Sequence, residues 1–428
     1  MTYTIQLPIP SNIRQKNVSY RYPGEVVVEY TILNYTPENP DSTIYRSVIL
    51  DTNTQTPVSF SPVKSIPFAE FAEKYPTLSE DIQITEMAEG TMINLFYDTT
   101  VKMWQIATKS AVGGHYWYFN AQVYGVKHHT PGTSNPAISK TFRKMFYDAL
   151  RADYATPLSD IPFIAELNKD VAYSFVLQHP ENHLVFRIDH PRLILVSMFL
   201  IVKNSGRGAE GGQENSGERS SKEFAHTHTE NTYHVELIPQ YDFTTILSDL
   251  PLYSGMVNAP EYIFCNEIQT TSALVHLEYE HKKGIVITNT RTGERTKLDH
   301  PEYLKRKELR GNHPHLHYQY LALVHMGKVH EFLHYFPMYS HMFRQFYTQY
   351  QTFITDVHQA YVSYYIHRNT DTSIPKRHFI HAARIHHSIF IPSLSTQKIV
   401  IKRKVVQEYF SKMDPREILF SMYYHEPK

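Results

Sequence analysis

The chain of 428 residues is 42% hydrophobic, which is enough for two or three domains with a substantial core. Its 42 lysines and arginines balance 42 aspartates and glutamates, so the formal net charge is zero. No apolar run reaches roughly 18 residues, the length of a membrane span, and residues 1–10 lack a signal pattern. The single cysteine, Cys265, excludes an internal disulfide and a cysteine zinc cluster. We therefore expect a protein that is not secreted, has no membrane partner and is located in the cytoplasm or in a virion.

The first 303 residues have the pattern of strands joined by turns, which predicts an antiparallel β core with peripheral helices. Residues 26–32 read VVVEYTI, a run of β-branched and aromatic side chains that is typical of a strand. Residues 141–151 form a helix candidate, and the apolar run at 192–202 predicts a buried strand or helix. Further strands are expected at residues 43–51, 82–86, 91–97 and 102–108.

Residues 203–231 differ from their surroundings, because they are rich in glycine, serine and charged residues and contain no apolar cluster. Such a segment cannot bury enough surface to offset the entropy of ordering. We expect a mobile surface insertion, or alternatively a loop that becomes ordered on a partner.

From about Leu304 the pattern becomes helical. Residues 346–364 place aromatic and apolar side chains at helical spacing, which predicts a helix with one buried face. Pro337 ends the preceding helix, and Asp414 followed by Pro415 predicts the start of a terminal helix. We expect a first domain over residues 1–305 and an all-helical C-terminal domain over residues 306–428.

The C-terminal part is basic, since residues 304–428 contain 17 lysines and arginines against 8 aspartates and glutamates. Lys402, Arg403 and Lys404 form its densest group. We expect this surface to bind RNA through phosphates, and the alternative is a helix face that is only solvated. The 26 histidines match no zinc-binding spacing, so we expect no metal site.

Two neighbouring segments suggest a family. Residues 86–91 read EMAEGT, and residues 104–110 read WQIATKS. They resemble the RNA ligase 1 type of covalent nucleotidyltransferases, in which one strand carries Glu-Lys-x-Asp-Gly-Ser and the next ends in Trp-x-Ile-x-Thr-Arg-Gly-Ser. The resemblance implies an α+β nucleotidyltransferase-like fold, in which an antiparallel β core binds ATP.

Weaker matches follow in the order that the family has them, over roughly residues 40–310. They are YRSVILD at 45–51, FAEF at 68–71, SFVL at 174–177, PENHLV at 180–185, LIVKN at 200–204, KGIVI at 283–287 and KLDHPEYL at 297–304. By this resemblance, the side chains of Arg46, Lys109, Lys203 and Lys297 are expected to contact phosphates. Phe175 is a candidate for contact with a base, and its alternative is a place in the core.

The chain departs from the family where the chemistry occurs. The nucleophilic lysine is replaced by Met87, and a thioether cannot form a phosphoramidate. Val176 and Lys283 replace two glutamates, and Asp299 replaces a lysine. Glu89 stands where the family has aspartate. These changes predict that no catalytic residues remain and that ATP and magnesium are no longer cofactors.

The sequence therefore predicts a pseudoenzyme, meaning a ligase-like protein that is not an enzyme. It would be retained for RNA binding or as a structural or assembly component, with RNA or other virion proteins as partners, in a large DNA virus or phage. The alternative is an active ATP-dependent RNA ligase with a displaced nucleophile, for which Lys109 and Lys283 are the nearest candidates.

Overall fold

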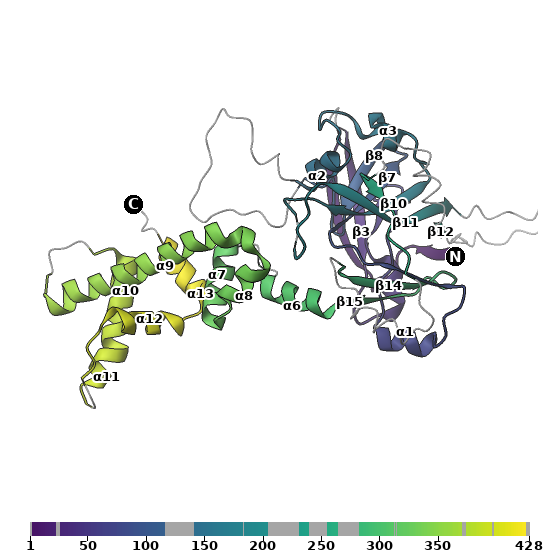
Figure 1. The fold of residues 1–428 in the computed structure, drawn as a ribbon. Helices are drawn as coiled ribbons and strands as arrows, with labels where there is room; N and C mark the ends of the chain where they lie inside the picture. The colour runs from purple at the N-terminus through teal and green to yellow at the C-terminus, as the bar shows by residue number, and fades with distance from the viewer. Residues whose placement is uncertain are drawn as a thin grey trace, which may run out of the picture. The chain divides into compact units, whose positions relative to one another are not determined.

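The structure is a computed structural model of the chain, which divides into two compact units (Figure 1). The first comprises Met1–Trp117 and Asn135–Leu304, and the second comprises Tyr118–Ser134 and Lys305–Lys428. Strands dominate the first unit and helices the second, so the expected α+β fold class is confirmed. The structure describes residues 2–22, 26–115, 141–182, 184–203, 231–238, 255–263, 282–311, 313, 315–369, 374–395 and 398–424.

The largest sheet of the first unit is antiparallel apart from one short strand at its centre. All eight residues of β10 (Val171–Gln178) are buried, as expected for a strand that is covered on both faces. The short strand β13 (Val257–Asn258) pairs in parallel with β11. The strand order is β1 (Thr2–Leu7), β12 (Asn231–Ile238), β11 (Arg192–Lys203), β10, β7 (Thr91–Asp98), β8 (Met103–Thr108) and β9 (Ala111–Val112).

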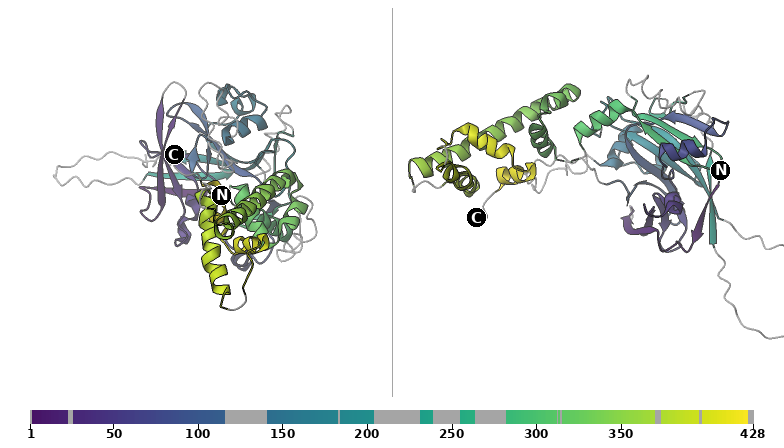
Figure 2. Two further views of the ribbon diagram at one scale, coloured as in Figure 1. Left: turned by 90° about the vertical axis from the view of Figure 1, so that its left-hand side faces the viewer. Right: turned by 90° about the horizontal axis from the view of Figure 1, so that it is seen from below.

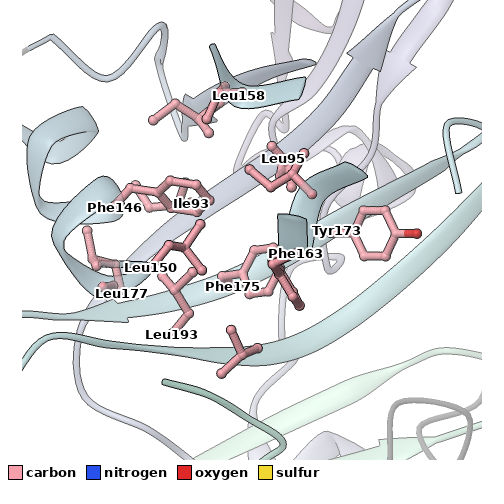
Figure 3. Packing of buried hydrophobic residues seen from close by; sticks show 14 of the residues in the cluster. Ile93, Leu95, Phe146, Leu150, Leu158, Phe163, Tyr173, Phe175, Leu177 and Leu193 are labelled. Carbon is pink, nitrogen blue, oxygen red and sulfur yellow. The ribbon is translucent and has the colours of Figure 1, made fainter. Parts of the chain in front are cut away.

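Two helices cover one face of this sheet. They are α2 (Phe142–Ala149) and α3 (Pro162–Ala165), and the Thr141 side chain caps α2 by accepting a hydrogen bond from the Lys144 amide. Figure 3 shows the resulting core, in which Phe146, Phe163 and Phe175 pack with leucines from the strands. Each fully buried phenylalanine contributes about 1.5–3 kcal/mol, so this layer holds the sheet flat against its helices.

Two smaller sheets complete the first unit. One has the order β2 (Arg14–Arg21), β3 (Val27–Asn34), β4 (Val48–Asp51), β5 (Pro57–Ser59). The other has the order β15 (Arg295–Asp299), β14 (Gly284–Asn289), β6 (Ile82–Glu86). Helix α1 (Phe68–Lys74) packs on this three-stranded sheet through the fully buried Phe71.

The strand expected at residues 43–51 forms only in part, because a 3₁₀ helix occupies Pro40–Tyr45 before β4 begins. The Ser42 hydroxyl accepts from the Thr36 amide and donates to the Asn39 carbonyl, and such local bonds compete with strand pairing.

The strands expected at 26–32, 82–86, 91–97 and 102–108 and the helix at 141–151 are confirmed, each within two residues at its ends. The run at 192–202 is strand β11. The expected insertion at 203–231 lies outside the described residues, apart from its two ends.

The second unit has its own aromatic core around the long helix α9 (Ser340–Tyr361), which continues as a π-helical turn over Val362–Ile366. Figure 2 shows the helices of the second unit, coloured green to yellow, in two further views. The predicted buried face of this helix is confirmed, since Phe346, Tyr350 and Phe353 are buried. No helix within the described ranges is long and apolar enough to cross a membrane. The other helices from Pro301 onward are α6 (Pro301–Arg310), α7 (Leu316–Met326), α8 (Val329–Tyr335), α10 (Lys376–Ile385), α11 (Ile391–Ser393), α12 (Arg403–Ser411) and α13 (Pro415–Tyr423), with a second π-helical turn at His386–Phe390.

Candidate phosphate-binding site

Strand β15 presents alternate side chains to its two faces, as any strand does. Thr296 is fully buried, and its hydroxyl donates to the Ile66 carbonyl at 2.9 Å. Leu298 packs against the apolar cluster around Phe71. Arg295 and Lys297, which alternate with Thr296 and Leu298 along the strand, therefore share its opposite face.

Besides Arg295, two further cations, Arg46 and Lys283, lie close enough to Lys297 to affect its charge. Burial, together with the charges of Arg295, Arg46 and Lys283, lowers the pKa of Lys297 to about 6, against a smaller attraction from Asp299. Arg46 lies in the turn before β4, where its Nη1 donates to the Pro62 carbonyl at 3.2 Å. A lysine with this pKa is mostly a neutral amine at pH 7, because burial and, to a smaller extent, the surrounding positive charges disfavour its protonated form.

The two arginines repel each other in the same way. Burial lowers the pKa of Arg295 to about 10, and the charge of Arg46 adds to this effect. Burial also lowers the pKa of Arg46, whereas Tyr35 acts in the opposite direction. Burial is the largest cause of all three shifts, and the charges of neighbouring cations add to it at Lys297 and Arg295.

Two more lysines lie near Tyr35, the residue whose charge acts on Arg46. The Nζ atoms of Lys64 and Lys109 each lie 5.7 Å from the centre of the Tyr35 ring. Lys64 also donates to the Ser65 carbonyl at 3.4 Å, and the Ser65 hydroxyl accepts from Arg295 at 3.3 Å. We call Arg46, Lys64, Lys109, Lys283, Arg295 and Lys297 the cation cluster.

The cation cluster contains little negative charge. Asp299 is the carboxylate that acts on Lys297, and one of its oxygens, Oδ1, is buried with no hydrogen-bond partner among the described residues. Within the described residues, no His, Cys, Asp and Glu side chains form a group of three that would hold a metal ion.

A glycine fixes the position of Lys283 and Asp299. Gly284 opposes Asp299 in the β14–β15 pair, and its φ is +153°. A Cβ atom there would lie 2.0 Å from the Leu298 carbonyl oxygen, so only glycine allows this close approach. The Lys283 ammonium lies 5.7 Å from the centre of the Tyr303 ring.

Met87 follows strand β6 at the edge of the same sheet, where its amide donates to the Gly284 carbonyl at 2.9 Å. Its side chain is buried, with 5% of its surface exposed. The position expected for the nucleophile thus lies next to the strand that follows Lys283, but it offers a thioether. The groups of this region that can bind a ligand by charge are therefore the side chains of the cation cluster, and the Met87 side chain is not one of them.

Glu89 has a structural role that the sequence did not reveal. Its buried carboxylate accepts three backbone hydrogen bonds, from Leu184 at 2.7 Å, Val185 at 2.7 Å and Phe186 at 3.0 Å. Hydrogen bonds from backbone amides to a carboxylate are among the strong ones in proteins. Glu89 therefore anchors the segment after β10, and no local pattern in the sequence predicts such distant partners.

Phe175 and Val176 lie in the centre of the large sheet. Phe175 has no exposed surface and packs edge-to-face on Phe146, 6.2 Å between ring centres, and on Phe163 at 6.3 Å (Figure 3). The candidate contact of Phe175 with a base is therefore wrong, because no base can reach a fully buried ring. The alternative, a place in the core, is what the structure has.

Lys203 lies in a different place from the cation cluster. It lines a pocket of about 220 Å³ together with Lys169, Tyr97 and Tyr233. Lys169 lies 4.9 Å from the centre of the Tyr97 ring. The expected phosphate contacts of the first unit are thus divided, with Arg46, Lys109 and Lys297 in the cation cluster and Lys203 outside it.

The basic group of the second unit lies at the start of α12. Its members Lys402, Arg403 and Lys404 are exposed. Arg403 donates to Thr355 at 3.1 Å and also binds Gln351, and Lys404 lies 4.0 Å from Glu408. The arginine is therefore partly engaged by α9, and the two lysines remain directed to solvent.

No family model and no curated protein matches this sequence. Among solved structures, the chain is similar to an archaeal ATP-dependent RNA ligase at 9% identity and a TM-score of 0.39, over 92% of this chain and 82% of that one. It is also similar to a putative ATP-dependent DNA ligase from Aquifex aeolicus, at 11% identity and a TM-score of 0.38. That match covers 70% of this chain and 62% of the DNA ligase. A Naegleria gruberi RNA ligase with ATP and Mn gives 9% identity and a TM-score of 0.35, over 69% and 80%.

These similarities correct one expectation. The sequence predicted that the chain is not an enzyme, and this is contradicted, because the solved structures it resembles are ATP-dependent ligases, which are enzymes. At these TM-scores no residue role is transferred from those structures to this chain.

Proposed function

We propose that this protein is a ligase-like RNA-binding protein and that its cation cluster binds the phosphates of RNA. The observation that carries the proposal is the lowered pKa of Lys297, to about 6, in a group of like charges that contains one carboxylate, Asp299. Such a group is unfavourable in the free protein and becomes favourable when an anion enters it.

Tyr35 supports a nucleic acid as the anion. Its ring is only partly buried and lies between the ammonium groups of Lys64 and Lys109. Proteins that bind single-stranded nucleic acid combine cations along the backbone with aromatic rings on which bases stack. A simple inorganic anion has no base that could stack on this ring.

A salt titration of RNA binding tests the proposal. A short single-stranded RNA with a fluorescent 3′ end is titrated with three forms of the full chain, which are the natural protein, a Lys109→Met, Lys297→Met double variant, and a variant in which Lys402, Arg403 and Lys404 are all glutamine. Each phosphate contact contributes roughly 0.7 to the slope of log affinity against log salt for single strands. We expect the double variant to lose affinity and about 1.4 units of slope, and the triple variant to keep both.

The opposite result would place RNA on the second unit. If the triple variant loses affinity and slope while the double variant matches the natural protein, the cation cluster is not the binding surface. A protein that binds no RNA at low salt would contradict the proposal as a whole. Lys169→Met serves as a matched control, because this lysine is exposed like Lys109 and lies at the other pocket.

A second candidate function is covalent nucleotidyl transfer, and the neutral amine of Lys297 favours it. An amine attacks phosphorus only when it is unprotonated, which Lys297 mostly is at pH 7. Lys297 therefore joins Lys109 and Lys283 as a candidate nucleophile. Intact mass spectrometry after incubation with ATP and Mg²⁺ or Mn²⁺ decides this. A nucleotide adduct that disappears in Lys297→Arg supports transfer, and an unmodified protein contradicts it.

The origin in a large DNA virus, a place in the virion and a structural or assembly role remain predictions from the sequence. They depend on the family resemblance and on no feature of the cation cluster.

A further inference from the structure

The second unit holds an exposed apolar side chain in a fixed position just before α12. Val400 has 66% of its surface exposed, whereas the neighbouring Ile401 has 7%. The Ile399 amide donates to the Ser393 hydroxyl at 3.1 Å, and the Ile401 carbonyl accepts from the ring of His358 at 3.1 Å. Val400 therefore lies between two anchored residues, and an apolar group that is already held in place loses little entropy when it binds.

Cations lie on both sides of this valine. Residues 398–402 read KIVIK, and we call them the anchored segment. Its two lysines, Lys398 and Lys402, are exposed like Val400. An apolar side chain between two cations is complementary to a partner surface that combines an apolar hollow with carboxylates.

A pocket of about 640 Å³ beside the anchored segment has this complementary chemistry. Ile389, Val405 and Met413 supply apolar lining, and each of them is only partly buried against the core of the unit. Ile399 lines the pocket as well, so the pocket and the anchored segment adjoin each other on the second unit. The volume lies within the range of roughly 300–1,000 Å³ that is usual for pockets that receive a ligand.

Carboxylates outnumber cations around this pocket. Glu408, Asp414 and Glu417 line it, and Lys412 is the one cation among the lining residues that the structure describes. The Lys404 ammonium lies 4.0 Å from Glu408, but both side chains are exposed, and an exposed pair at this distance contributes little. The pocket therefore offers negative charge to a cation that approaches together with an apolar side chain.

We propose that this protein forms a symmetric dimer through its second unit, in which the anchored segment of each copy lies in the pocket of the other. Val400 then contacts the apolar lining, while Lys398 and Lys402 face Glu408 and Glu417. A two-fold dimer uses the same surface of both copies, so this surface must be complementary to itself. A basic apolar segment that adjoins an acidic apolar pocket meets this condition. The inference depends neither on the cation cluster nor on RNA binding.

Sedimentation equilibrium of the full chain tests the dimer. We expect a dissociation constant of about 1 μM or tighter, as for specific interfaces of ordinary size. Val400→Asp should weaken dimerisation by about a hundredfold or more, because a charge would enter the apolar part of both pockets. Val27→Asp is the matched control, since Val27 is 48% exposed in the first unit and its replacement should leave the dimer intact.

Charge reversal tests whether the anchored segment pairs with the pocket. A Lys398→Glu, Lys402→Glu variant and a Glu408→Lys, Glu417→Lys variant should each dimerise about tenfold more weakly or worse, because like charges then meet across the interface. A mixture of these two variants should form a mixed dimer about as stable as the natural one, since both of its contacts again join opposite charges. All four positions are exposed, so the variants should fold like the natural protein.

Four results would overturn the inference. A natural protein that remains a monomer at about 100 μM has no such interface. A dimer that neither Val400→Asp nor the charge reversals weaken uses another surface. Reversed variants that stay monomeric when mixed contradict the pairing of segment and pocket. A monomer whose pocket binds a free peptide of sequence KIVIK shows that a basic apolar segment of another protein, and not a second copy, is the occupant.

Discussion

Binding of an anion at the cation cluster should draw a proton into the protein. Lys297 has a pKa of about 6 in the free protein, so at pH 7.5 only about 3% of its side chains are charged. A phosphate beside it raises the pKa again, because a nearby negative charge favours the protonated form, and the side chain then becomes charged. Each bound ligand should therefore take up about one proton at pH 7.5.

The same shift determines how affinity depends on pH. Below pH 6 Lys297 is protonated in both states, so its contribution to affinity is constant. Above pH 6 the free protein must acquire a proton to bind, and affinity should fall by about tenfold per pH unit toward pH 10.

Calorimetry in two buffers of different ionisation enthalpy measures the proton directly. The ligand is an RNA with a 5′-hydroxyl, because phosphodiesters do not titrate in this range and the proton must come to the protein. Lys297→Arg is the matched variant, since arginine stays charged throughout. It should bind without proton uptake and with an affinity that does not depend on pH above 6.

The reasoning is refuted if the natural protein binds RNA without taking up a proton. It is also refuted if Lys297→Arg takes up the same proton, which would identify another group. Asp299 and Lys283 are the other titratable neighbours of Lys297 that face the ligand. Asp299→Asn and Lys283→Arg would then locate the proton.

Three further outcomes are expected from buried residues, all measured by urea unfolding of the full chain. Glu89→Gln should lower the free energy of unfolding by about 1–3 kcal/mol, because three backbone amides lose their charged acceptor. Gly90→Ala should cost more than Gly255→Ala, since a Cβ at Gly90 would lie 2.4 Å from a backbone oxygen, whereas nothing lies within 4 Å at Gly255. Burial lowers the pKa of His317 to about 4, so the unfolded chain binds its proton first as pH falls. About 2 kcal/mol should be lost between pH 7.5 and 5, and His317→Gln should remove most of this loss.

Much of the fold was predictable because it depends on local periodicity. The aromatic face of α9 and the N-cap of α13 by Asp414 both follow from residues close together in the chain. The strand expected at 43–51, which forms only over Val48–Asp51, shows the limit of this reasoning. Tyr45 and Val48 suit a strand, but the hydroxyl of Ser42 satisfies the local backbone and favours a 3₁₀ helix.

The candidate site was predictable only in the residues that a motif contains. Arg46, Lys109 and Lys297 were found through the resemblance, whereas Lys64 and Arg295 were missed. Arg295 could have been found from its alternation with Lys297 in the strand pattern Arg-Thr-Lys. Lys64 gave no signal, because its segment is irregular and only tertiary packing brings it to the others.

The energetic cost of the cation cluster is itself an argument for function. Replacing Lys297 by methionine removes a charge that the free protein disfavours, so this variant should be no less stable than the natural protein and should unfold at higher urea concentration near pH 6. A side chain kept only for stability would show the reverse. A substitution that strengthens the fold and abolishes anion binding would show that Lys297 is maintained for its ligand. If Lys297→Met destabilises the fold instead, packing of the lysine stem outweighs the repulsion, and the lowered pKa loses its meaning as a sign of function.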